Sequence, residues 1–340
     1  MRLLSASLVL AVAITAALTT VYAQPKTVTL ELKGTPGSQL TYDNTMTFDM
    51  EMTVPSPGGG PQMLTIRPSI RGSARTETLV KSVAENGDLT LATKLDSFDG
   101  RLDVADLHLQ VGIYGERADP GENRPRFPTR GFVPPQLFKL PELPVQMVMD
   151  KRGKLIEIKG LAGLIPPIPG PQGMKINLGD YITKVVSQFS QPMFPDRPVT
   201  VGDRWEVKMV VDPAQMTEAL GVPMPPEAKQ QMSAMKFPIQ MTSTLVGFED
   251  SGGVDCAKIE TTAPWQLSMP MSPPQSGQGG AATLRESGTT KCTLWFDYAA
   301  GRTVRQTAEF SMDMTAGPES KTMVKMTMKG SGETVLNSNP

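Results

Sequence analysis

The chain has 340 residues, with 33 lysines and arginines, 34 aspartates and glutamates, and a formal net charge of −1. Neither sign of charge gathers into a run, so the sequence lacks the basic stripe that marks a nucleic-acid-binding protein. The single histidine, His108, excludes multi-histidine zinc sites, and no G-x-S-x-G motif accompanies it to suggest a serine hydrolase.

The first 23 residues have the pattern of a secretory signal peptide. Arg2 supplies the positive start, residues 3–18 form an apolar stretch, and Val21-Tyr22-Ala23 resembles a cleavage site. We therefore expect an exported protein, either periplasmic or secreted. No later segment approaches the roughly 20 apolar residues of a membrane-spanning helix, so we expect no integral membrane segment after signal removal.

Leu40, Tyr42, Met46, Phe48, Met50, Met52 and Val54 alternate with polar side chains over residues 40–54, LTYDNTMTFDMEMTV. A period of two is typical of a strand with one apolar and one wetted face. Asn86-Gly87 predicts a hairpin turn, because both residues tolerate positive φ. Similar patterns predict strands at 27–33, 63–83 with a break near Pro68 or Gly72, 89–95, 107–113, 145–149, 155–158, 239–248, 254–267, 284–296, 304–314 and 323–336.

Two segments, 161–193 and 212–236, interrupt the strand pattern. In the first, Ile182, Val185, Val186 and Phe189 follow the i, i+3, i+4, i+7 spacing of an amphipathic helix. The second mixes methionines with prolines and predicts short helices. An exposed apolar sheet face has to be covered or curled, so we expect the insertions to pack on its concave face. The prediction is a mainly β protein: residues 24–340 form a single domain, a large, curved, half-barrel-like antiparallel sheet with one or two short helical insertions.

The two cysteines, Cys256 and Cys292, lie on neighbouring predicted strands. A hairpin turn centred on Pro274 would place them directly opposite each other, at a Cα separation that a disulfide accepts. Because disulfides persist in exported proteins, we predict a structural disulfide between them.

Methionine is unusually frequent, with 22 in the chain. Five pairs have the spacing Met-x-Met, which puts both sulfur atoms on one face of a strand. Three interpretations remain open: ordinary core packing, which we favour, a deformable apolar groove, and a Cu(I) site. We expect no metal site and no cofactor. The pairs are Met50 and Met52, Met147 and Met149, Met269 and Met271, Met312 and Met314, and Met326 and Met328.

The segment FPDRPVTVGDRWEV at 194–207 resembles the signature of a family of uncharacterised exported bacterial proteins, in which Pro-Val-x-Val-Gly-Asp-x-Trp leads into a strand. GVDCAKIE at 253–260 and LWFDYAAGRTV at 294–304 resemble closing hairpins of the same family. The overall shape is similar to half-barrel carriers of lipoproteins and lipids in bacterial envelopes. The resemblance implies no assigned activity.

No nucleophile and base can be paired from the sequence, so we predict no catalytic residues and no enzyme activity. The leading hypothesis is a non-catalytic envelope protein that binds an apolar ligand, such as a lipid, between the sheet and its insertions. Ile182, Val185, Val186 and Phe189 would then contact that ligand. The alternative is a structural or protein-interaction module with a filled core, and protein partners stay open. An apolar cavity of at least roughly 300 Å³ would favour the first hypothesis.

Overall fold

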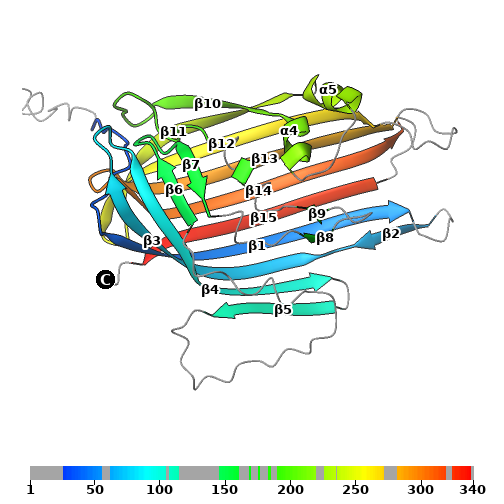
Figure 1. Ribbon diagram of the computed structural model, residues 1–340, viewed down its shortest axis with the longest axis horizontal. Coiled ribbons are helices and arrows are strands. Elements are labelled where there is room, and N and C mark those ends of the chain that lie inside the picture. Colours follow the sequence, from blue (N-terminus) through cyan, green and yellow to red (C-terminus); the bar gives the residue numbers. More distant parts are fainter. Residues whose placement is uncertain are drawn as a thin grey trace, which may run out of the picture.

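The computed structural model describes residues 26–55, 62–104, 107–114, 145–160, 168–169, 175–176, 183–184, 190–219, 226–234, 236–271, 282–318 and 324–337. These residues form one large, strongly curved antiparallel sheet that does not close (Figure 1). The fold class predicted from the sequence is therefore confirmed.

Thirteen strands make up this sheet, in the order β10-β11-β12-β13-β14-β15-β1-β3-β4-β6-β7, with β2 paired to β1 and β5 paired to β4. The first and last long strands are neighbours, because β1 pairs with β15 from Thr41 to Thr53. The main strands are β1 (Gln39–Pro55), β3 (Ser69–Val83), β4 (Leu89–Val104), β10 (Arg204–Val211), β11 (Phe237–Ser251), β12 (Val254–Met271), β13 (Ala282–Asp297), β14 (Arg302–Pro318) and β15 (Val324–Asn337). Shorter strands are β2 (Met63–Ile66), β5 (Leu107–Tyr114), β6 (Val145–Met149), β7 (Leu155–Lys159) and the separate pair β8 (Ile168–Pro169) and β9 (Lys175–Ile176).

The hairpin turn predicted at Asn86-Gly87 forms between β3 and β4. Gly87 has a φ of 90°, and its N–H donates to the carbonyl of Ala84 at 2.9 Å. Pro68 lies between β2 and β3, where a strand break was expected, whereas Gly72 lies inside β3. The β6–β7 hairpin turns at Gly153, which has a φ of 83°.

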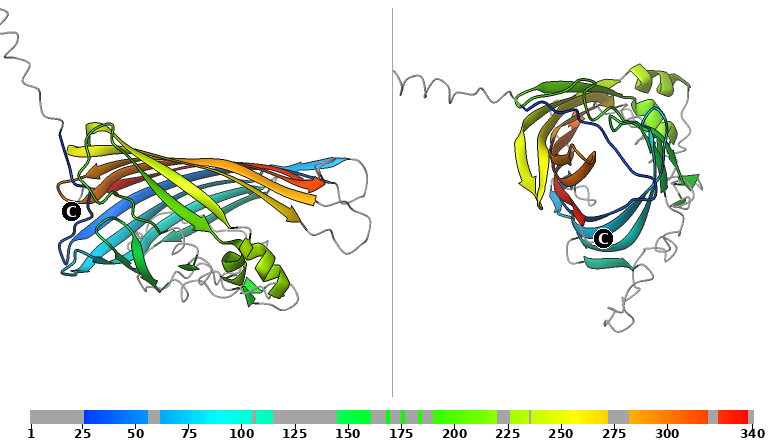
Figure 2. Two further views of the ribbon diagram at one scale, coloured as in Figure 1. Left: turned by 90° about the horizontal axis from the view of Figure 1, so that it is seen from above. Right: turned by 90° about the vertical axis from the view of Figure 1, so that its left-hand side faces the viewer.

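The curvature turns the sheet into an open roll, with β10 at one edge and β7 at the other (Figure 2). Helices α4 (Pro213–Ala219) and α5 (Pro226–Ala234) follow β10 and lie at the open side of the roll. They confirm the short helices expected in the second insertion. Among the described helices, none has the length and apolar character needed to cross a membrane.

The amino-terminal strap, which we define as residues 26–38, crosses the interior at one end of the roll (Figure 2). Its backbone pairs with Val199 through Val28, donates from Leu32 to Lys151 O at 2.7 Å, and donates from Lys33 to Gly301 O at 2.9 Å. The prediction of a strand at 27–33 is wrong, since this segment makes a single bridge pair and then leaves it. The strap instead connects the two edges of the roll.

The main core lies under this strap. Leu30 is completely buried, and Val28 is 7% exposed. The rings of Phe194 and Phe296 pack at a centroid distance of 4.6 Å. The core therefore fills one end of the roll, and the remaining members of the cluster are Val199, Trp205, Leu245, Ala257, Ile259 and Leu294.

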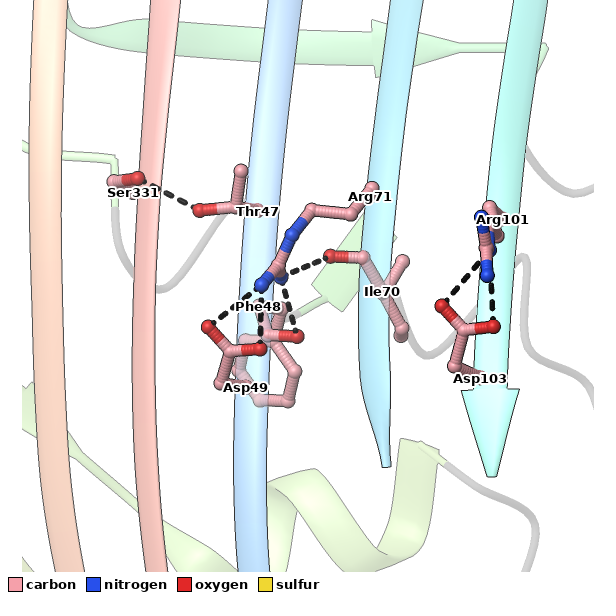
Figure 3. A network of polar contacts seen from close by, with 8 residues as sticks. All are labelled: Thr47, Phe48, Asp49, Ile70, Arg71, Arg101, Asp103 and Ser331. Atoms are coloured by element: carbon pink, nitrogen blue, oxygen red, sulfur yellow. Dashed lines mark hydrogen bonds and ion pairs between the residues drawn. The ribbon is translucent and has the colours of Figure 1, made fainter. Parts of the chain in front are cut away.

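The convex face of the sheet is covered by charged and hydroxyl side chains. Arg71 on β3 binds both carboxylate oxygens of Asp49 on β1, at 2.7 and 3.0 Å (Figure 3). Thr47 and Ser331 share a hydrogen bond of 2.8 Å on the same face. Period-two patterning thus gives the sheet a polar outside, which leaves its apolar residues for the concave side.

The predicted disulfide is wrong. Cys292 is the Cα partner of Thr261, so Cys256 lies five residues away along β12, roughly 16 Å at the rise of a strand. An odd displacement also puts the two side chains on opposite faces. Both cysteines are free thiols.

Candidate functional site

The concave face can be followed from strand to strand by register. Leu245, Ile259 and Leu294 are successive cross-strand partners, and all three belong to the core under the strap. Leu294 in turn opposes Gln306, and Gln306 opposes Thr334. Along each of these strands, the residues an even number of positions away from Leu245, Ile259, Leu294, Gln306 or Thr334 therefore face the concave side.

A partly enclosed cavity of about 450 Å³ lies on this face, beside the core. Its floor comes from strands β10 to β14 of the sheet. Its cover comes from the β6–β7 hairpin and from the segment that precedes β10. The floor residues are Val207, Met241, Ser243, Ile259, Thr261, Cys292, Leu294 and Gln306, and the cover residues are Gly153, Leu155, Ser190, Gln191 and Met193.

The cover is held by backbone contacts between two segments distant in sequence. The N–H groups of Met193 and Phe194 donate to Arg152 O at 2.8 and 3.0 Å. Trp205 closes the other side, because its Nε1 donates to Met193 O at 3.0 Å. The cover of the cavity is thus fixed to both edges of the roll.

Polar side chains around the cavity are largely paired with each other or with the backbone. Ser190 Oγ donates to Leu155 O at 3.0 Å and accepts from Leu155 N–H. The hydroxyls of Ser243 and Thr261 share a hydrogen bond of 2.8 Å. Because these hydroxyl groups already have hydrogen-bond partners within the protein, they do not require a polar ligand. The lining therefore suits an apolar ligand.

Cys292 supplies a thiol to the cavity floor. Burial raises the pKa of this thiol, while a hydrogen bond with the Gln306 side chain opposes the rise. A buried neutral thiol behaves as a small apolar group and is a poor nucleophile. The position therefore favours packing against a ligand over covalent chemistry.

A second, polar pocket of about 330 Å³ lies beside the cavity and shares Gln191 and Val207 with it. It lies along the edge strand β10. Cationic side chains outnumber acidic ones in its lining. The cationic residues are Arg152, Arg197, Arg204 and Lys208, and the acidic ones are Asp196 and Glu206.

The structure brings together few of the residues singled out in the sequence. Ile182, Val185, Val186 and Phe189 lie outside the described residues, so their role in ligand contact stays a prediction. Of the helix that contains them, only residues 183–184 are described, and they are helical. The sheet residues of the cavity floor were missed, although Met241, Ile259 and Cys292 lie on strands that were predicted. Among the described residues, no group of three or more histidine, cysteine, aspartate or glutamate side chains could hold a metal ion.

No protein-family model matches the chain, and no curated protein sequence is significantly similar to it. Among solved structures, a lipovitellin structure on lipid–protein interactions aligns with a TM-score of 0.41 and 11% identity, over 89% of this chain and 25% of that one. Pseudomonas aeruginosa OpdQ aligns with a TM-score of 0.24 and 7% identity, over 88% and 98% of the two chains. The translocator domain of autotransporter NalP from Neisseria meningitidis aligns with a TM-score of 0.16 and 12% identity, over 97% of each chain. The chain spans about a quarter of the lipovitellin chain, and likenesses this low carry no functional argument.

Proposed function

We propose that this protein is a non-catalytic exported protein that holds an apolar ligand, such as a lipid, on the concave face of its sheet. The observation that carries this proposal is the cavity of about 450 Å³ between the sheet and its cover. Ligand pockets in proteins span about 300 to 1,000 Å³ and are lined mainly by apolar side chains with a few polar groups. The cavity has both properties.

The alternative, a structural or interaction module with a filled core, fits the end of the roll under the strap. It fits the cavity less well, because a void of this size in a purely structural core forfeits packing contacts on all sides. Val207 and Met241 line the void and are only half-buried, although Val207 packs against the tightly filled core cluster. An open apolar space beside a tightly packed one favours a ligand.

The neighbouring polar pocket suggests the shape of that ligand. An amphiphile could place its chain in the apolar cavity and an anionic head group near Arg204 and Lys208, since the two pockets share Gln191 and Val207. Charge-assisted hydrogen bonds from arginine and lysine are the usual way in which proteins bind carboxylates and phosphates. A fatty acid is therefore a suitable probe, and its methyl ester tests the head group.

A large side chain introduced on the floor of the cavity tests this proposal, because it would occupy the space of the ligand. Cys292→Trp should weaken uptake of a fluorescent fatty acid by at least about tenfold, equivalent to about 1.4 kcal/mol of binding free energy. Its stability should change little, because a hollow site accommodates added volume. Thr262→Trp is the matched control, since Thr262 is exposed on the outer face and neighbours Thr261, the partner of Cys292.

Two results would contradict the proposal together. One is a wild-type protein that takes up no fatty acid and copurifies with no lipid in native mass spectrometry. The other is a Cys292→Trp variant that loses about 1 to 3 kcal/mol of stability, as overpacking of a filled core does. That combination would support the structural module instead.

A further inference from the structure

Three of the Met-x-Met pairs lie side by side in the sheet, on the adjacent strands β14, β15 and β1. In one row, Met312 opposes Met328, which opposes Met50. In the next row, Met314 opposes Met326, which opposes Met52. We call these six residues the methionine array, and it consists of Met50, Met52, Met312, Met314, Met326 and Met328.

The array lies on the concave face, beyond the cavity. Gln306 lines the cavity, and Met312 and Met314 are an even number of residues further along β14, so they point to the same side. Neighbouring strands are about 4.8 Å apart, and alternate residues on a strand about 6.6 Å, so the six Cα atoms occupy a patch of roughly 10 by 7 Å. Flexible methionine side chains can bring several sulfur atoms to one point above such a patch.

The array is open rather than sealed. Only Met312 is buried, at 7% exposure, whereas the other five members are half-buried. In contrast, the core under the strap contains fully buried Leu30, Phe194 and Phe296. The methionines therefore line an accessible surface.

An aromatic ring lies beside the array. The indole of Trp265 covers Gly288, because a Cβ placed on Gly288 would collide with the ring, and Gly288 is the cross-strand partner of Met312. The same indole stacks on Phe310 at a centroid distance of 5.5 Å. The face of a tryptophan ring attracts a cation through its quadrupole.

A single carboxylate completes these surroundings. Glu286 opposes Met314, and one of its oxygens accepts a hydrogen bond from Trp265 Nε1 at 3.3 Å. In the inward-facing series of the described strands β12 to β15 and β1, the other acidic residue is Asp255, which lies at the strap end of β12 and is ion-paired with Lys26 at 2.6 Å. A monovalent cation bound by neutral thioethers in an apolar surface requires such a counter-charge.

We propose that the methionine array binds Cu(I) through thioether sulfurs, with Glu286 as the counter-charge and Trp265 beside the ion. Thioethers are soft, neutral ligands that select Cu(I) over hard cations such as Mg²⁺ and Ca²⁺. The sequence alone favoured ordinary core packing because it could not show that the pairs of β1, β14 and β15 lie in register. This site is separate from the apolar cavity and does not depend on it.

The test is an anaerobic titration of the full chain with Cu(I) against a competing chelator. We expect one Cu(I) per chain, bound with sub-micromolar affinity, and X-ray absorption of the bound ion dominated by sulfur neighbours. Changing Met314, Met326 and Met328 together to leucine should weaken binding at least about tenfold, while volume-conserving changes of this kind keep the fold. Met147→Leu with Met149→Leu is the matched control, because this pair opposes Leu91 and Leu89 rather than other methionines.

Glu286→Gln provides a second variant that leaves every thioether in place. It should weaken Cu(I) binding while fatty-acid uptake stays at the wild-type level. The proposal fails if the wild-type chain cannot compete with the chelator, if both methionine variants lose equal affinity, or if the bound ion shows only nitrogen and oxygen neighbours. The wild-type absorption spectrum decides the ligand type even if a variant does not fold.

Discussion

Removal of the Leu30 side chain tests whether the strap closes the end of the roll. Leu30 is completely buried and belongs to the same core cluster as Phe194 and Phe296. Truncation of buried leucines to alanine costs about 2 to 5 kcal/mol, depending on how far the neighbours relax into the space. The strap has hydrogen bonds on both sides of Leu30, through Val28 and Leu32, and therefore cannot move far. We expect Leu30→Ala to lower the free energy of unfolding by about 3 kcal/mol.

Urea unfolding followed by tryptophan fluorescence measures this change, because Trp205 belongs to the same cluster. Val201→Ala is the matched control: Val201 lies near the same end of the roll and is 52% exposed, so its truncation should stay within about 0.5 kcal/mol. Hydrogen exchange should also accelerate at the N–H groups of Leu32 and Lys33 in Leu30→Ala. A loss below about 1 kcal/mol would refute the strap as part of the core.

Two further predictions concern titratable groups. Burial raises the pKa of the Cys256 thiol to about 11, so native Cys256 should resist thiol reagents at neutral pH. After unfolding without reductant, the chain should expose two free thiols. A Cys256–Cys292 bridge in non-reducing mass mapping would contradict this prediction. Burial of Asp212 opposes ionisation, but an ion pair with Lys236 at 3.1 Å and the N–H groups of Ala214 and Gln215 outweigh it, and the pKa falls below its usual 3.8. Because the folded pKa is the lower one, this stabilisation is present above about pH 4 and is lost as the pH falls through the folded pKa. Asp212→Ala should cost about 1 kcal/mol at neutral pH, because it removes the N-cap of α4, and it should flatten the acid limb of a stability–pH curve. An unchanged acid limb would show that Asp212 contributes nothing.

Local patterning allowed the strands and their faces to be predicted. The alternation of residues 40–54 is borne out by β1, and Asn86-Gly87 forms the expected turn. These features depend on neighbours in sequence, where side-chain period and backbone preference decide the structure. The assignment of residues 27–33 to a strand failed because its partners, Val199, Lys151 and Gly301, are distant in sequence.

The pairing register between neighbouring strands could not be predicted from the sequence. The loop between β12 and β13 has no turn motif that specifies its centre, and a displacement of five residues moved Cys292 from Cys256 to Thr261. An odd displacement changes the face as well as the position of a side chain. The same limitation concealed the methionine array, because the pairs of β1 and β14 are neighbours only through β15, at the opposite end of the chain.

Whether the roll is hollow depends on which side chains follow one another along the inward face. Under the strap the inward positions carry Phe296, Trp205 and Leu245, which fill the space with the strap itself. Further along, aromatic rings lie over glycines: the ring of Phe48 would be 3.2 Å from a Cβ on Gly330, and the Trp265 indole covers Gly288. A ring that lies over a glycine packs against the sheet surface instead of extending from it. The same alternating pattern therefore gives a tightly packed core at the strap end of the roll and an open, methionine-lined concave face further along the strands. The proposed ligand site and the proposed Cu(I) site both depend on this change from packed to open.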